Sequence, residues 1–235
     1  MPNEPLIPPH GGYRKLKSFQ LAELVFDLTV RFCDQYIPPR SRTHDQMVQA
    51  ARSGVQNIAE GSQVSGTSKK MEIKLTSVAR ASLEELRRDF EDFLRQKGLP
   101  KWEPDHTALQ RLKVRRCATL DEFRAWVANE VKRAEKNTDG HRQTRTININ
   151  SPKGVRVSPC SSVLPPIAPA VFVANGALCL LNLCCYLLDR QMAAQASAFE
   201  KEGGFTERLY QRRSQRRQED ARHDSHRIGQ HSDGR

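Results

Sequence analysis

The chain has 235 residues, of which 37% are hydrophobic and 6% aromatic, and its formal net charge is +11. That length suits one fair-sized domain with or without tails. The composition indicates an ordered core diluted by solvated segments. The charge predicts attraction to phosphate or to an anionic membrane surface, unless the excess lies in arginine-rich tails that have no specific target.

The first long helix is predicted over residues 16–37, after a proline-containing N-terminus (1–15) that we expect to be disordered and to carry no secretory signal. Apolar residues recur along the helix at spacings of three and four, which is the stripe of an amphipathic helix. They are Leu21, Val25, Leu28, Phe32 and Tyr36. Pro38 and Pro39 end the helix, because proline lacks an amide hydrogen and clashes with the preceding turn.

A second helix is predicted to begin at Thr43, whose hydroxyl can accept a hydrogen bond from a free amide, with Asp45 in its first turn. Its buried face is formed by Met47, Ala51, Val55 and Ile58. We expect Gly61 to end it in a left-handed conformation, which glycine adopts at little cost.

The third predicted helix begins at Ser68, with Glu72 in its first turn, and runs to about residue 97, where Gly98 and Pro100 end it. Its apolar residues alternate four and three apart, which is typical of a helix in a bundle. They are Ala79, Leu83, Leu86, Phe90 and Phe93.

Residues 101–165 give the weakest pattern and are predicted to be an insertion followed by a linker. Residues 119–136 favour a short amphipathic helix with Phe123, Trp126, Val127 and Val131 facing inward. From 137 to 162 the chain is polar and contains Gly, Pro and Ser, as a linker or long loop does.

The last long helix is predicted over about 167–202, with Gly203 and Gly204 closing it. It is apolar on every side as far as Leu188, so it resembles a membrane span as much as a helix buried in a core or an oligomer. Asn175, Gly176 and Asn182 interrupt the apolar run and favour the core helix, so no membrane partner is expected.

The elements together predict an all-α protein, an antiparallel up-down four-helix bundle whose third and fourth helices are separated by the insertion. The expected regions are a disordered N-terminus (1–15), three bundle helices (16–100), an insertion and linker (101–165), the fourth helix (166–204) and a basic, mostly disordered tail (205–235).

Two blocks of the sequence resemble a known family. They contain "NIAEG" (57–61), "ARASLEEL" (79–86), "ANGALCLLNLCCYLLDRQ" (174–191) and "EKEGGFTER" (200–208). Together they resemble the four-helix bundle proteins encoded in intervening sequences of large-subunit ribosomal RNA genes, in the subgroup with a long insertion and a C-terminal suffix.

The resemblance implies a small helical bundle that assembles as a ring-like homopentamer and has no catalytic activity. One relative, the accessory protein of diversity-generating retroelements, resembles a basic scaffold for nucleic acid and a reverse transcriptase. The motif residues carried over are Asn57, Glu60, Gly61, Arg80 and Ser82. We expect a structural role for them, with Arg80 pairing with Glu60 and Asn57 bonding a loop carbonyl.

Catalytic and metal patterns are missing from the sequence. It contains no G-x-S-x-G, no G-x-x-x-x-G-K-[ST] and no H-E-x-x-H, so we expect no enzyme activity, no cofactor and no metal. The six cysteines form no C-x-x-C pair, which favours reduced thiols and a cytoplasmic protein.

What remains is positive charge in three clusters. Candidate nucleic-acid contacts are Lys69, Lys70 and Lys74 in the third helix and Arg208, Arg212, Arg213, Arg216 and Arg217 after the fourth. The insertion holds Arg111, Lys113, Arg115 and Arg116. The sequence therefore favours a non-enzymatic oligomeric protein that binds RNA or DNA without sequence preference. The alternative is an oligomeric scaffold for a protein partner, with the basic segments incidental.

Overall fold

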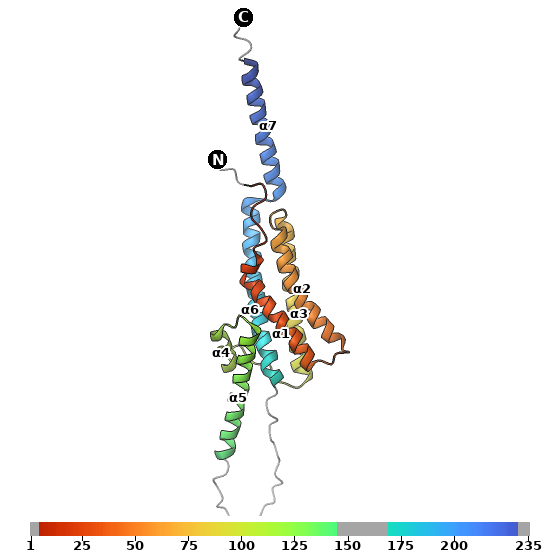
Figure 1. Cartoon of the computed structure of the whole chain (residues 1–235), viewed down its shortest axis with the longest axis vertical. Helices are drawn as coiled ribbons and strands as arrows, with labels where there is room; N and C mark the ends of the chain where they lie inside the picture. Colours follow the sequence, from red (N-terminus) through yellow and green to blue (C-terminus); the bar gives the residue numbers. More distant parts are fainter. Residues whose placement is uncertain (1–4, 145–168, 230–235) are drawn as a thin grey trace, which may run out of the picture.

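The computed structural model describes residues 5–144 and 169–229, and the side chains of 5–136 and 169–222. Every regular element in these residues is helical (Figure 1). After a short 3₁₀ turn at Tyr13–Lys15, the helices are α1 (Lys17–Tyr36), α2 (Arg42–Val64), α3 (Lys69–Gln96), α4 (Thr107–Arg115), α5 (Leu120–Thr144), α6 (Pro169–Glu202) and α7 (Phe205–Gly229). The prediction of an all-α fold is confirmed.

One apolar core joins α1, α2, α3 and α6. The stripes predicted for the first and third helices supply it: Phe32 of α1 lies 4.8 Å, centroid to centroid, from both Phe90 and Phe93 of α3. All five seam residues of α3 are buried. Local periodicity was enough to find these faces, because an apolar stripe repeating every 3.6 residues must be covered by another element.

Two pairs of neighbouring helices in this core, α3 with α6 and α2 with α3, run in opposite directions. As α3 advances from Glu72 to Arg80, its hydrogen-bond partners on α6 run back from Gln195 to Asp189. The short connection from Val64 to Lys69 folds α3 back on α2, where the Ser53 and Ser82 hydroxyls lie 2.9 Å apart.

The limits of α2 differ from the prediction. Ser41, not Thr43, caps the helix, and its hydroxyl accepts from the Thr43 amide. Gly61 is not the helix stop: α2 continues to Val64, whose carbonyl accepts the amides of Thr67 and Ser68 and so closes the turn into α3.

Gly61 is needed for close packing between two helices. A Cβ atom there would lie 3.3 Å from the carbonyl oxygen of Glu72 and 3.4 Å from Cβ of Leu75, both on α3. The start of α3 can therefore approach the backbone of α2 because the side chain is missing, and no left-handed conformation is involved.

The insertion is folded as far as the structure describes it. The predicted helix at 119–136 is confirmed as the first part of α5, with Phe123 and Trp126 buried and Val127 and Val131 partly buried. Helix α4 was not predicted, and the part of the predicted linker at 145–162 lies outside the described residues.

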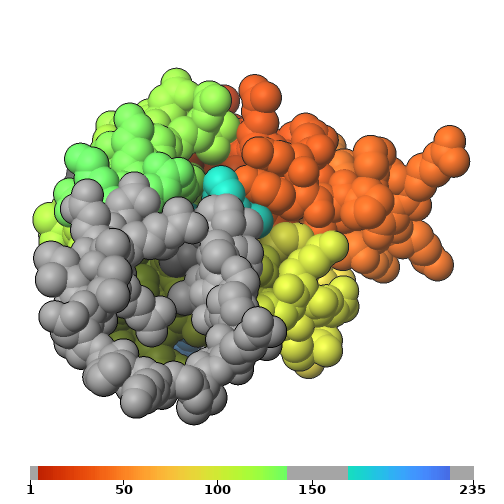
Figure 2. Space-filling model, turned by 90° about the horizontal axis from the view of Figure 1, so that it is seen from below, coloured from red at the N-terminus to blue at the C-terminus, as the bar shows by residue number. Residues whose placement is uncertain are grey.

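The insertion covers the first half of α6, which explains why that half is apolar on every side. Asn175 of α6 is buried; its amide donates to the carbonyl of Pro100 at 2.9 Å and its oxygen accepts from the Trp102 amide at 2.7 Å. A Cβ on Gly176 would lie 2.7 Å from Phe123 and 2.8 Å from Trp126. Seen from below, the insertion helices and the helices α1 to α3 lie on opposite sides of the start of α6 (Figure 2).

The C-terminal tail, predicted to be mostly disordered, forms helix α7 as far as Gly229. The segment contains many arginines, glutamines and glutamates, which have high helix propensity, and the prediction gave too much weight to its few apolar anchors. Gly203, at φ +67°, ends α6 as predicted, and α7 extends from that end of the molecule well beyond the packed helices (Figure 1).

Candidate nucleic-acid interface

Helix α7 carries one of the dense runs of positive charge in the described part of the chain. Between positions 208 and 217 there are five arginines and no acidic residue. Arg212, Arg213, Arg216 and Arg217 are exposed on the helix surface. Because α7 is helical here, Arg208, Arg212 and Arg216 share one side of it at four-residue steps, as the sequence predicted for a helical continuation.

The start of α7 is fixed by a local capping contact. The amide of Gly204 donates to the Glu207 carboxylate, which lies in the first turn of the helix, where negative charge is favoured. Arg208, in the next position, is half-buried, and its Nε and Nη2 atoms are buried without a hydrogen-bond partner. Arg208 is therefore less accessible than the four arginines that follow it.

The lysines predicted for the same interface lie at the start of α3. Lys70 and Lys74 are exposed, whereas Lys69 is partly buried and forms an ion pair with Glu72 at 3.4 Å. The other carboxylate oxygen of Glu72 accepts from Gln195 of α6 at 3.1 Å. Gln195 lies about two turns before the end of α6, so the structure brings these lysines to the end of the molecule from which α7 departs (Figure 1).

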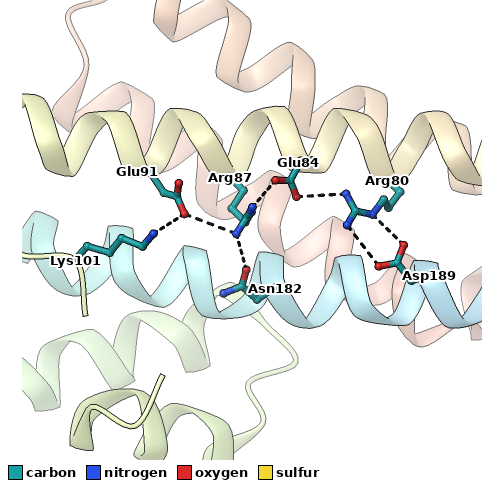
Figure 3. A network of polar contacts seen from close by, with 7 residues as sticks. All are labelled: Arg80, Glu84, Arg87, Glu91, Lys101, Asn182 and Asp189. Carbon is teal, nitrogen blue, oxygen red and sulfur yellow. Dashed lines mark hydrogen bonds and ion pairs between the residues drawn. The ribbon is translucent and has the colours of Figure 1, made fainter. Parts of the chain in front are cut away.

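The ion pair expected between Arg80 and Glu60 is not formed. Arg80 instead donates from Nε to Asp189 of α6 at 2.9 Å and pairs with Glu84, one turn further along α3, at 3.4 Å (Figure 3). Glu60 is exposed on α2. The prediction failed because Arg80 projects from the side of α3 that faces α6, whereas α2 contacts a different side.

Asn57 also differs from its predicted role. Its amide donates to the carbonyl of Ser53 at 2.8 Å and to the Ser53 hydroxyl at 3.1 Å, both within α2, and not to a loop carbonyl. The Ser53 hydroxyl in turn meets that of Ser82. Asn57 and Ser82 therefore belong to one polar contact between α2 and α3.

A chain of charges continues along the surface between α3 and α6 (Figure 3). Arg87 pairs with Glu84 and with Glu91 at 3.7 Å, and Lys101 reaches Glu91 at 2.8 Å. The hydrogen bond from Arg87 lowers the pKa of the Glu84 carboxyl, and the one to Asp189 raises the pKa of Arg80. Both shifts favour the charged forms of these two side chains, as expected in an ion-pair network.

The basic cluster of the insertion is divided by the structure. Arg111 forms a two-pronged ion pair with Glu130, whose side chain is only 4% exposed, and thereby joins α4 to α5. Lys113 donates to the carbonyl of Pro104 at 2.7 Å. Arg115 and Arg116 are exposed at the end of α4. Of these four cations, Arg115 and Arg116 are the two whose side chains form no ion pair or hydrogen bond that holds the fold together in the described part of the chain.

Several residues that build this structure were missed from the sequence, and their partners are far away along it. Asp189 lies 109 residues from Arg80, and Asn175 lies 73 and 75 residues from the two residues it bonds. The interruption of an apolar run by Asn175 and Gly176 was the one signal available, and it was used only as an argument against a membrane span.

One helix is long and apolar enough to cross a membrane, by length and composition alone; its apolar window lies in α6, and 67% of that window is buried inside the protein. A buried core helix passes the same test. Among the residues described, no group of three His, Cys, Asp or Glu side chains could hold a metal ion. The five cysteines described are free thiols.

In comparisons with known proteins, no family model, no curated protein and no solved structure matches this chain.

Proposed function

We propose that this protein is a non-enzymatic, oligomeric helical-bundle protein that binds nucleic acid through its phosphate backbone, without sequence preference. The observation that carries the proposal is the run of five arginines without an acid on a helix that stands clear of the packed core. Phosphate contacts from arginine supply affinity but no sequence information.

The distribution of charge supports this function. The apolar side chains of α1, α2, α3 and α6 are used in the core, and the arginines of α7 contribute nothing to it. An exposed helix that adds no core contacts has no evident structural task. Lys70 and Lys74 extend the positive surface at the same end of the molecule.

The finer arrangement of the fold is also a proposal. The opposite directions of neighbouring core helices support an antiparallel up-down four-helix bundle, with α4 and α5 as the insertion.

Self-association is supported by two exposed side chains: Leu183 and Tyr186 on α6 are 49% and 54% exposed. Sedimentation should show a species several times 26.7 kDa, and a monomer at micromolar concentration would count against assembly.

The same exposed pair of side chains supports the second candidate function, a scaffold for a protein partner. Leu183 and Tyr186 follow the stretch 171–181 of α6, in which every residue is buried or partly buried, and a protein partner could bind over these two exposed side chains. In this case the arginines of α7 would be incidental, and the protein would not bind nucleic acid at low salt.

A binding assay at two salt concentrations tests the proposal. If five phosphates are neutralised on duplex DNA, the affinity should fall roughly 500-fold between 50 and 200 mM salt, because about 0.9 log units are lost per log unit of salt for each contact. Changing the five arginines from Arg208 to Arg217 to glutamine should remove most of this dependence. If that variant binds as tightly as the unchanged protein, α7 is a solvated appendage and Lys70 and Lys74 are the next residues to test.

A further inference from the structure

The five arginines of α7 from Arg208 to Arg217 cover one half of the helix circumference. At 100° per residue, and counted from Arg208, Arg212 lies at roughly 40° and Arg216 at roughly 80°, while Arg213 and Arg217 lie at roughly 140° and 180°. They form two rows: row A holds the exposed Arg212 and Arg216, with the half-buried Arg208 at its start, and row B holds Arg213 and Arg217. The other half of this stretch is uncharged and holds Gln211, Ser214, Gln215 and Gln218.

We propose that α7 enters the major groove of duplex DNA, with row A facing the phosphates of one strand and row B those of the other. This inference rests on the proposed function and names the class of nucleic acid. An α-helix with its side chains is roughly 10–12 Å across, and the major groove of B-form DNA is about 12 Å wide. Two rows about 100° apart point toward the two walls of such a groove, whereas a flat phosphate surface needs only one row.

The length of the basic stretch fits a single groove crossing. Arg208 and Arg217 are separated by nine residues, or roughly 13 Å along the helix axis, which spans about four phosphates on each strand. Glu219 and Asp220 follow and repel phosphate, so the contact ends there. Because α7 stands clear of the other helices beyond its first turns, the remaining helices of the described ranges 5–144 and 169–229 do not block its approach (Figure 1).

The other nucleic acids fit α7 less well. The major groove of A-form RNA is deep and too narrow for side chains to read. Binding to a single strand relies on stacking against aromatic side chains, and from Thr206 to Arg222 the only aromatic residue is Tyr210. The absence of a stacking platform and the half-cylinder of arginines together favour the duplex.

Fluorescence anisotropy with the full chain tests the preference for duplex DNA. Three probes of equal length are compared: duplex DNA, duplex RNA and single-stranded DNA. We expect the tightest binding to duplex DNA, by at least tenfold. Methylation of the bound DNA should show protection of guanine N7, which lies in the major groove, and none of adenine N3, which lies in the minor groove. Equal binding to all three probes without N7 protection would overturn the inference and leave the proposed function standing. No binding to any probe at 50 mM salt would overturn both.

Matched variants separate the two rows. Row A is weakened by Arg212→Gln with Arg216→Gln, and row B by Arg213→Gln with Arg217→Gln. Each pair should lower the salt dependence by roughly 1.8 log units per log unit of salt, since two contacts are lost. The control, Gln215→Ala with Gln218→Ala on the uncharged half, should change nothing. Glutamine and alanine are good helix formers, so circular dichroism should show equal helicity in all three. If only one row affects binding, α7 lies on one strand and does not sit in the groove.

Discussion

Replacing Asp89 by asparagine should stabilise the protein at neutral pH. Asp89 is a partly buried carboxylate on α3, and its burial, followed by the charges of Glu85 and Asp92, raises its pKa from 3.8 to about 6. It also helps to raise the pKa of the buried Cys33 thiol of α1 to about 12, after the larger effect of burial. The charged form of Asp89 is therefore disfavoured in the folded protein.

The direction and size of the effect follow from that pKa. In the folded protein the Asp89 carboxyl stays protonated up to about pH 6, whereas in the unfolded chain it loses its proton at about pH 3.8. The protein therefore loses stability as the pH rises from 3.8 to about 6. A rise of about two pH units corresponds to at most ~3 kcal/mol. Asp89 is only partly buried and solvent screens its charge, so we expect about 1–2 kcal/mol.

Urea denaturation of the unchanged protein and of Asp89→Asn measures this at pH 4 and pH 8. The variant should be more stable at pH 8 by about 1–2 kcal/mol, and the difference should shrink or vanish at pH 4, where Asp89 is protonated in the folded protein. Asp105→Asn, an exposed carboxylate in the α3–α4 connection, should show no such gain. Equal stability of Asp89→Asn and the unchanged protein at pH 8 would refute the reasoning.

Three further substitutions test packing through thermal denaturation. Gly61→Val should lower the stability of the protein more than Gly61→Ala does. Because Gly61 is helical, the Gly61→Asn variant should be no more stable than the Gly61→Ala variant. A clearly more stable asparagine variant would mean that Gly61 does end the helix in a left-handed conformation. Gly176→Val should lower the free energy of unfolding by about 3 kcal/mol or more, because the valine side chain would overlap the buried Phe123 ring. A variant as stable as the unchanged protein would mean that α5 does not dock on α6. Arg111→Met should cost about 2–4 kcal/mol, because the buried Glu130 carboxylate loses its two-pronged partner and keeps only Arg133 at 3.9 Å. Adding Glu130→Met should recover much of that loss, and no recovery would contradict a role as an ion pair.

The sequence predicted those parts of the fold that depend on local periodicity. The stripe of α1 and the seam of α3 are short-range patterns, and Ser68 caps α3 as expected because its hydroxyl accepts from the Met71 amide three residues away. Gly61 was misread because a glycine that permits close packing and a glycine that ends a helix look alike in one sequence. Only the approach of Glu72 and Leu75 from α3 tells them apart.

The arginines of the candidate interface were predicted from the sequence, but the helix that carries them was not. The arginines after α6 could be read directly from the chain, whereas the helix that arranges them had little apolar patterning to reveal it. The Lys69–Glu72 pair, three residues apart, could have been expected from helical spacing. Arg80 could not have been assigned to Asp189, because that pair forms only when α6 packs antiparallel to α3.

The apolar character of α6 has two sources, and they bear differently on assembly. From Val171 to Leu181 its sides are covered by α4 and α5 together with the core helices, so this part needs no second copy of the chain to bury it. Beyond Leu181 the insertion ends, and Leu183 and Tyr186 are left about half exposed. An interface between copies would therefore have to use this shorter segment. Leu183→Glu with Tyr186→Glu should then shift the sedimentation of an assembled protein toward 26.7 kDa without unfolding it, because both side chains are already in contact with water. A variant that stays assembled would mean that the copies meet elsewhere.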